Sequence, residues 1–121
     1  MRFFKKSSKY ISPKDVHEVT IPNDATEIGE YVYANNLSLS KVTIPSSVKE
    51  ICKCAFLGCS SLKNITIPNS VTKIGDNAFS GCSSLTKAYV PSIFKNIKNV
   101  FPENCKLEEQ TFNNQNIIDN F

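Results

Sequence analysis

The sequence contains no apolar run long enough to span a membrane, because proline, asparagine, lysine and serine interrupt every hydrophobic stretch. Residues 1–13 are basic and carry no hydrophobic core of the kind that a signal peptide needs. The net charge is only +3, and basic residues are interleaved with acidic ones along the chain. These absences argue against membrane insertion and against binding to nucleic acid, for which no motif is present.

Groups that carry out catalysis are also scarce. His17 is the single histidine, and the sequence places no triad-like partner within its reach. No glycine-rich phosphate loop follows a predicted strand, and the acidic residues show no paired placement typical of acid–base catalysis. The sequence therefore predicts that the protein is not an enzyme and holds no cofactor, and that His17 is an exposed strand residue.

What the sequence does contain is an internal repeat of 23 residues, a period that indicates a solenoid. Four prolines mark it, each preceded by a β-branched residue: Pro22, Pro45, Pro68 and Pro91. The same step aligns three apolar columns: Val16, Leu39, Leu62 and Leu85; Val19, Val42, Ile65 and Ala88; and Ile28, Ile51, Ile74 and Ile97. A coil this short cannot bury its apolar face alone, so successive coils must stack and share one core.

The unit at residues 62–82 predicts two short extended segments joined by turns. Leu62, Ile65 and Ile67 keep an apolar inward face around the polar Asn64 and Thr66, which is the pattern of a half-buried strand, and Pro68 ends that strand. A second apolar pair follows, after which Gly75 lets the chain turn. Residues 76–79 are typical of a single helical or 3₁₀ turn.

The turn that closes each coil has glycine or asparagine at one constant position: Asn35, Gly58, Gly81 and Asn104. These two residue types reach positive φ at the lowest steric cost. We therefore predict a positive φ at all four positions.

Stacked coils run their strands in parallel, about 4.8 Å apart, and turn each column into a ladder. Tyr33, Phe56 and Phe79 share one column and should stack, burying the largest apolar area of each coil. In the column beside them, Ala55 and Ala78 are small, with Val32 and Phe101 near the ends. The last unit departs from this pattern: Pro102 falls in the aromatic column, and one residue is missing between Cys105 and Leu107.

The predicted fold class is an α/β-type repeat solenoid, a short stack of about four 23-residue coils. A parallel sheet should form one face, and short strands or helical turns the other. We assign residues 16–112 to this repeat domain. Residues 1–15 are an N-terminal cap or basic tail, with Phe3, Phe4, Tyr10 and Ile11 available to cover the first coil. Residues 113–121 are a C-terminal cap or tail.

Two pairs of motifs resemble the BspA-like, or Treponema-type, leucine-rich repeats. They are Ile-Pro-x-Ser-Val-x-x-Ile at residues 44–51 and 67–74, and Ala-Phe-x-Gly-Cys-Ser-Ser-Leu at residues 55–62 and 78–85. The unit at residues 21–43 is more degenerate. The resemblance covers roughly residues 16–112 and implies a short leucine-rich repeat stack. Members of this family occur in host-associated bacteria and parasitic protists, often as surface or adhesive proteins, which makes the cell surface an alternative to the cytoplasm that the sequence alone suggests.

The five cysteines fall into two groups. Cys59, Cys82 and Cys105 share a column with Asn36, and in leucine-rich repeats such a ladder bonds to the backbone of the turn. We expect reduced, buried thiols there, and an odd cysteine count fits a reducing compartment. Cys52 and Cys54 lie outside the column and should be near the surface. Their spacing with Cys59 is not a standard zinc pattern, so a metal or redox role is only the third alternative.

The candidate binding site is the exposed face of the stacked strands. Its outward columns are predicted to be Glu18, Lys41, Asn64, Lys87 and Glu109, and beside them Thr20, Thr43, Thr66, Tyr89 and Thr111. The threonine column also fits ordinary β-propensity. From this face we select six candidate contact residues for a protein or glycan partner: Lys41, Lys63, Asn64, Thr66, Lys87 and Tyr89. The predicted function is a non-catalytic binding or adhesion module. The alternative is a structural unit that homo-oligomerises by stacking end to end.

Overall fold

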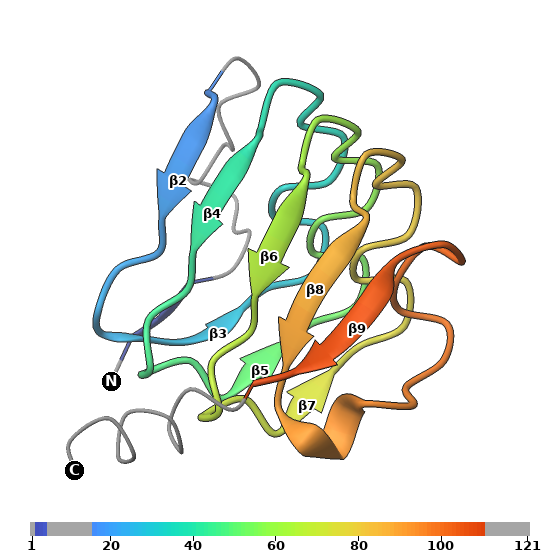
Figure 1. Cartoon of the computed structure of the whole chain (residues 1–121). Coiled ribbons are helices and arrows are strands. Elements are labelled where there is room, and N and C mark those ends of the chain that lie inside the picture. The colour runs from blue at the N-terminus through green and yellow to red at the C-terminus, as the bar shows by residue number, and fades with distance from the viewer. Residues whose placement is uncertain (1, 5–15, 111–121) are drawn as a thin grey trace, which may run out of the picture.

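The computed structural model describes the backbone of residues 2–4 and 16–110 and the side chains of residues 16–110. The chain winds as a stack of coils built almost entirely from short strands and turns (Figure 1). The strands are β1 (Arg2–Phe4), β2 (Glu18–Thr20), β3 (Ala25–Ile28), β4 (Lys41–Thr43), β5 (Glu50–Ile51), β6 (Asn64–Thr66), β7 (Lys73–Ile74), β8 (Lys87–Val90) and β9 (Lys106–Glu109). One 3₁₀ helix, η1 (Ser92–Phe94), lies in the described part of the last coil.

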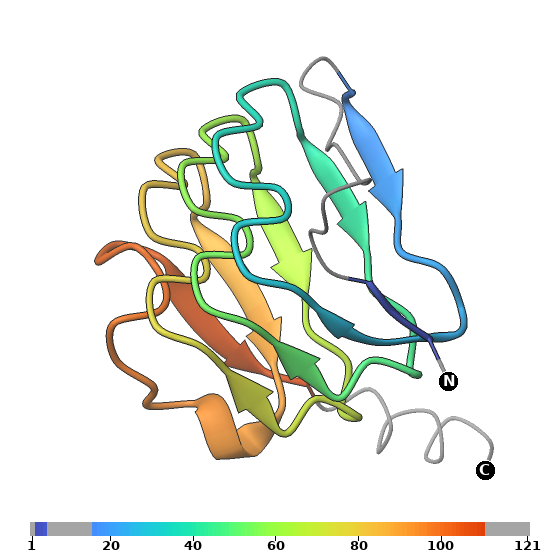
Figure 2. The same ribbon diagram turned by 180° about the vertical axis from the view of Figure 1, so that it is seen from behind.

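Two parallel β layers enclose the core. Strands β2, β4, β6, β8 and β9 lie side by side on the front, as a two-stranded β2-β4 sheet and a three-stranded β6-β8-β9 sheet (Figure 1). The rear sheet is four-stranded, in the order β1-β3-β5-β7, and is seen from behind in Figure 2. The predicted fold class, a parallel-sheet solenoid of about four coils, is confirmed.

The 23-residue step sets the strand register. Val19 lies opposite Val42 in the front layer, and Ile28, Ile51 and Ile74 form one ladder in the rear sheet. Because side chains alternate along a strand, the residues between the outward-facing ones point into the core. Ile65 and Ala88 are accordingly almost completely buried.

A ladder of aromatic rings runs through the centre of the stack. The rings of Tyr33, Phe56 and Phe79 stack as predicted, with centroids 5.4 and 5.1 Å apart. The ladder continues to Phe101, whose ring lies 5.0 Å from that of Phe79. The sequence alignment that put Phe101 in the alanine column and Pro102 in the aromatic column was therefore wrong. The coil is shortened by one residue before Phe101. Val100 therefore occupies in the last coil the position that Ala78 occupies in the preceding one.

A second shortening precedes β9. Lys106 pairs with Lys87, and Glu108 pairs with Tyr89, so Glu109 does not occupy the column of Lys87 as predicted. The loop between Phe101 and β9 is shorter than its counterparts, which brings Lys106 into register earlier than the 23-residue step requires. Thr111, the residue predicted for the end of the second column, lies outside the described residues.

The left-handed turn positions were predicted in part. Asn35, Gly58 and Gly81 have φ values of 62°, 75° and 76°, as predicted, whereas Asn104 does not have a positive φ. A second column, in which the sequence did not predict positive φ, also has it: Tyr31, Cys54, Asn77 and Asn99. With a left-handed residue at its second position, the segment 76–79 forms turns, and the predicted single helical or 3₁₀ turn was wrong.

Residues 2–4 add strand β1 to the edge of the rear sheet, beside β3. The side chains of Phe3 and Phe4, and all of Tyr10 and Ile11, lie outside the described residues, as do residues 113–121. The assignment of residues 1–15 and 113–121 as caps or tails, and the boundaries of the repeat domain, stay predictions.

Candidate functional site

The front layer presents two rows of side chains to the outside, which we call the strand face. The first row is Glu18, Lys41, Asn64, Lys87 and Lys106, and the second is Thr20, Thr43, Thr66, Tyr89 and Glu108. Each row has one member per coil because the in-register strands repeat the same outward position. The buried side chains beneath, such as Val42, belong to the core and hold the rows in place.

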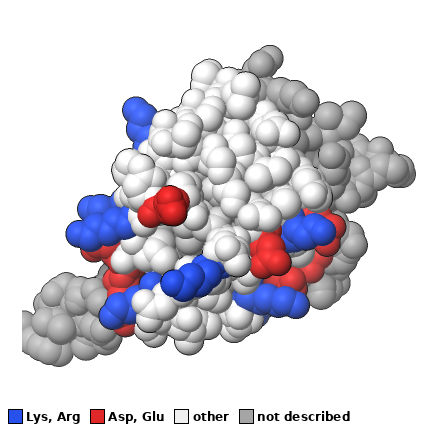
Figure 3. Space-filling model, turned by 90° about the vertical axis from the view of Figure 1, so that its right-hand side faces the viewer, with Lys and Arg blue, Asp and Glu red and all other residues white. Residues whose placement is uncertain are grey.

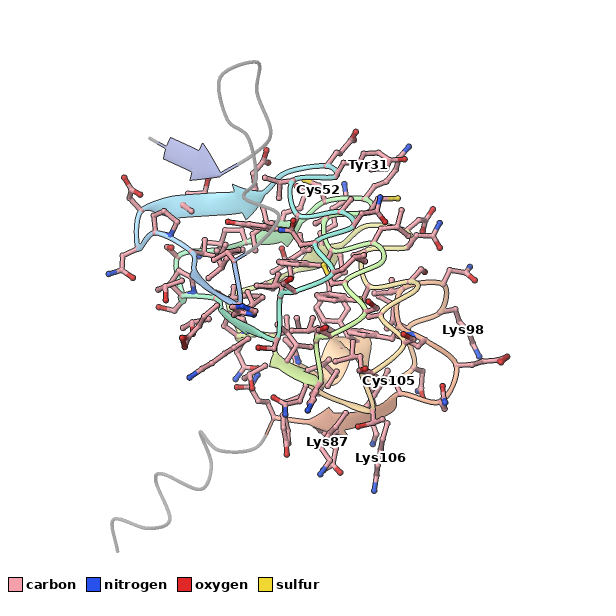
Figure 4. All side chains as sticks on the ribbon, turned by 90° about the horizontal axis from the view of Figure 1, so that it is seen from above. Tyr31, Cys52, Lys87, Lys98, Cys105 and Lys106 are labelled. Carbon is pink, nitrogen blue, oxygen red and sulfur yellow. The ribbon has the colours of Figure 1, made fainter. Side chains whose placement is uncertain are left out.

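The structure places five of the six predicted contact residues in these two rows, and the sixth, Lys63, at the rim beside them. Asn64 and Lys87 are direct register partners, as are Thr66 and Tyr89. Lys41 is exposed on β4, and Lys63 is exposed one residue before β6, at the upper rim of the face. Lys106 was missed, because the shortened last loop hides its alignment in the sequence. Figure 4 shows Lys87 and Lys106 projecting from the same edge of the molecule.

The cations of the strand face differ in how they are neutralised. Lys41 lies 3.6 Å from Glu18, and Lys106 lies 3.4 Å from Glu108. Lys87 instead places its ammonium group 5.7 Å from the centre of the Tyr89 ring, a cation–π contact. Lys63 has no acidic partner within ion-pair distance among the residues that the structure describes. Lys63 and Lys87 are thus the cations that this face leaves available for an external anion.

The front layer is interrupted between β4 and β6. The two strands belong to separate sheets, and a cleft of about 350 Å³ lies between them, lined by residues of both strands and by Gln110. The side-chain amide of Gln110 donates a hydrogen bond to the carbonyl of Ile67. This contact ties the end of β9 to the coil of β6, across the end of β8.

A second hollow lies where the front strands begin, and we call it the serine groove. It measures about 380 Å³ and is lined by His17, Leu37, Ser38, Ser40, Ser61, Lys63 and Ser84. His17 is exposed, as predicted, but it lies one residue before β2 and not in a strand. Its Nδ1 donates to the carbonyl of Ser38 at 3.2 Å, since a carbonyl can only accept. Of the six predicted contact residues, only Lys63 lines this groove.

The cysteine column forms the ladder that the family resemblance implied. The Sγ of Cys59 donates to the carbonyl of Tyr33 at 3.1 Å, and that of Cys82 donates to the carbonyl of Phe56 at 3.2 Å. Both thiols are fully buried, and all five cysteines are free. The neighbouring Cys59 thiol, together with burial, raises the pKa of Cys82. Cys105 departs from the column because of the shortened coil, and burial raises its pKa to about 11.

Cys52 lies in an acidic cluster on the rear sheet. Its Sγ and the carboxylates of Glu27 and Glu50 lie within 4.8 Å of one another, and Lys73 lies 3.9 Å from Glu50. Cys52 is half-buried, whereas Cys54 is buried, so the prediction of a near-surface position was wrong for Cys54. Burial, followed by the charge of Glu27, raises the pKa of Cys52 to about 12. The thiol is therefore protonated near neutral pH, the form that is a poor nucleophile and a poor metal ligand.

The raised pKa of Cys52 predicts a loss of stability in alkali. The unfolded chain releases this proton at the ordinary thiol pKa of 9.0, but the folded chain keeps it until about pH 12. The contribution of Cys52 to the free energy of unfolding is thus complete below pH 9.0 and is lost as the pH rises toward 12. The free energy of unfolding can be measured by denaturation followed by circular dichroism, below and within this pH window. It should fall less steeply with rising pH for Cys52→Ser than for the natural chain. Identical declines would contradict the prediction.

Comparison with known protein families identifies the type of repeat. A sequence model of the BspA type leucine rich repeat region matches residues 6–120, in six copies. The chain belongs to this family. The BspA-type resemblance noted from the sequence is thereby confirmed, and leucine-rich repeats of this kind serve as interaction modules with extended binding surfaces.

Three solved structures resemble this leucine-rich repeat chain. A leucine rich cell surface protein from Faecalibacterium prausnitzii A2-165 is 41% identical over 60% of this chain and 19% of its own, with a TM-score of 0.58. A leucine-rich repeat protein from Bacteroides ovatus is 22% identical, covering 90% and 42% of the two chains, with a TM-score of 0.57. The Treponema pallidum leucine rich repeat protein is 20% identical, covering 87% and 66%, with a TM-score of 0.53. The last two show the fold alone.

The chain spans between 19% and 66% of the length of these solved relatives. No curated protein sequence matches it. Within the described residues, none of the helical segments has the length and apolar character needed to cross a membrane.

Proposed function

We propose that this leucine-rich repeat chain is a non-catalytic binding module that recognises a protein partner through the strand face. The observation that carries the proposal is the regular outward array of Lys41, Asn64, Thr66, Lys87 and Tyr89 on in-register strands. A sheet held by the core beneath it can present such side chains without reorganising on binding, which lowers the entropic cost of association. The similarity to the 41% identical Faecalibacterium chain, a cell surface protein, supports an adhesion-type role.

Tyr89 and Lys87 are the proposed anchors of this contact. Tyr89 is half-buried and is the single aromatic residue in the two described rows of the strand face. Tyrosine is among the residues that most often dominate binding energy, because it combines a large apolar ring with a hydroxyl group. Lys87 lies over that ring and has no ion pair among the described residues, so it can reach a carboxylate of the partner.

The double variant Lys87→Glu, Tyr89→Ala tests the proposal. We expect it to weaken binding by about tenfold or more, in the range of a hot-spot loss. The melting temperature should change little, because both side chains are half-buried on the outer side of β8 and neither belongs to the core. Binding is measured by interferometry against the proteins that the natural chain captures from a cell-surface extract. The matched control is Lys53→Glu, Tyr31→Ala, which changes the same residue types on exposed positions of the turns. A fall in melting temperature for the first variant alone would mark these residues as structural.

End-to-end assembly stays the alternative, and one feature of the stack favours it. Within the described residues the aromatic ladder ends at Phe101, which is half-buried. Phe101 lines a hollow of about 670 Å³ together with apolar residues such as Ile97 and Leu107 and polar ones such as Lys98 and Glu103. Figure 3 faces this end and shows charged side chains across its lower half, on both the left and the right, with few in the upper part. If the ends associate, light scattering should show a mass that grows with concentration. A constant monomer mass would remove this alternative and leave the strand face.

A further inference from the structure

We propose that the serine groove and Leu37 together receive an acidic segment of the protein partner, with a carboxylate at Lys63 and a neighbouring apolar side chain on Leu37. This inference rests on the proposed binding function and names the chemistry of the partner. It adds a second contact at the upper rim of the strand face, where the front strands begin, to the anchors at Lys87 and Tyr89.

The groove offers hydroxyl donors because two of its serines have uncommitted hydroxyl groups. Ser40 and Ser61 donate to backbone carbonyls of the preceding coil, at 3.1 and 2.6 Å. The hydroxyls of Ser38 and Ser84 have no hydrogen-bond partner among the described residues, and both side chains line the groove. A serine hydroxyl rotates freely, so these two can turn their protons toward an anion.

Lys63 supplies the charge. Among the described residues that line the groove, Lys63 is the single lysine and none is acidic. Lys41 and Lys106, elsewhere on the strand face, each already have a glutamate within ion-pair distance. A carboxylate placed in the groove would therefore meet an available ammonium group without meeting a fixed negative charge. The local charge thus favours an anionic group of the partner.

Leu37 restricts the kind of anion. It is 61% exposed, although the corresponding positions in the next two coils are Ser60 and Ser83. A leucine in this column adds little to the core, and it exposes apolar surface beside the serine hydroxyls. A peptide places an apolar side chain next to a carboxylate, whereas inorganic phosphate and sulfated sugars do not. The pairing of Leu37 with Lys63 therefore favours an acidic, partly apolar protein segment.

The test uses the full chain and a defined probe, a blocked peptide of alternating leucine and aspartate. Titration is followed by ¹⁵N amide chemical shifts, and a leucine–asparagine peptide of the same length is the neutral control. We expect shifts at residues 37–40 and 61–63 with the acidic peptide, and about tenfold weaker binding with the neutral one. Lys63→Gln should reduce the affinity for the acidic peptide to that for the neutral peptide. Leu37→Ser introduces the residue found at this position in the next two coils, and it should weaken the binding of both peptides. Lys53→Gln is the control and should leave both affinities unchanged.

Three results would overturn the inference. The first is equal affinity for the two peptides, and the second is no effect of Lys63→Gln. The third is a set of shifts confined to the neighbourhood of Lys87 and Tyr89, which would leave the proposed strand-face function standing while removing the groove. Failure of the broader proposal is seen separately, as unchanged binding of the captured partner by the Lys87→Glu, Tyr89→Ala variant. Fold integrity of every variant is checked from the dispersion of the same spectra.

Discussion

Phe79→Ala is expected to lower the free energy of unfolding by about 3–5 kcal/mol, the range for removing a buried aromatic side chain. Phe79 is fully buried, and its ring lies between those of Phe56 and Phe101, at 5.1 and 5.0 Å. The coils are held in stacking register by the backbone, so neighbouring rings cannot close the space that the substitution leaves. The loss should remove a large share of the stability of so small a domain. Chemical denaturation followed by circular dichroism measures it.

Phe101→Ala is the matched control for this prediction. Among the residues that the structure describes, Phe101 stacks on Phe79 alone, and it is half-buried, so its removal should cost clearly less than that of Phe79. An equal loss for the two variants would mean that the ladder is not the centre of the core. It would then point to a fold in which the end coil is as tightly packed as the middle.

Gly75→Ala is expected to destabilise the protein by about 3 kcal/mol, the upper part of the range for forcing extra atoms into a packed interior. A Cβ at Gly75 would lie 2.4 Å from the backbone nitrogen of Lys53 and 2.7 Å from its Cα. These atoms belong to the preceding coil, and backbone cannot move aside as the end of a flexible side chain can. The alanine variant would have to push two coils apart, which should also weaken the bond from the Gly75 amide to the carbonyl of Ile51, now 2.7 Å long.

Cys52→Ala provides the comparison, because Cys52 holds the same position one coil earlier and already carries a Cβ. We expect only a minor change of stability there at neutral pH. If Gly75→Ala unfolds at the same denaturant concentration as the natural chain, the close approach between the two coils is not a constraint on the fold.

The glycine positions show where sequence reasoning succeeded and where it could not. Gly58 and Gly81 were predicted from local geometry, since a repeated choice of glycine or asparagine indicates a left-handed turn, and both have positive φ. Gly75 was interpreted in the same way, as a residue that lets the chain turn. It does not have a positive φ, and its lack of a side chain is needed by the backbone of another coil. That contact is between residues far apart in the sequence, so no local pattern reports it.

The rows of the candidate site were predicted correctly except at their last members. The rows containing Lys41, Asn64 and Lys87 follow from the period, because a repeat of constant length brings equivalent residues into register. The last member of each row was wrong, since the alignment allowed one missing residue before Leu107 and placed it in the column of Leu85. In the structure the loop before β9 is shorter still, and Leu107 pairs with Ala88. Lys106 therefore replaced Glu109 beside Lys87, which makes this end of the strand face more basic than predicted.

The amino-acid sequence by itself determined the stacked architecture, the inward columns and most of the aromatic ladder, because each of these repeats a local preference at a fixed interval. The tertiary structure alone decided which charges of the strand face are neutralised, how the last coil is shortened, and that serines from three coils meet beside Lys63 and Leu37. The physical reason is that periodicity specifies which residues share a face. The separation of two side chains depends on loop lengths and on packing between coils, which are set only when the whole stack has formed.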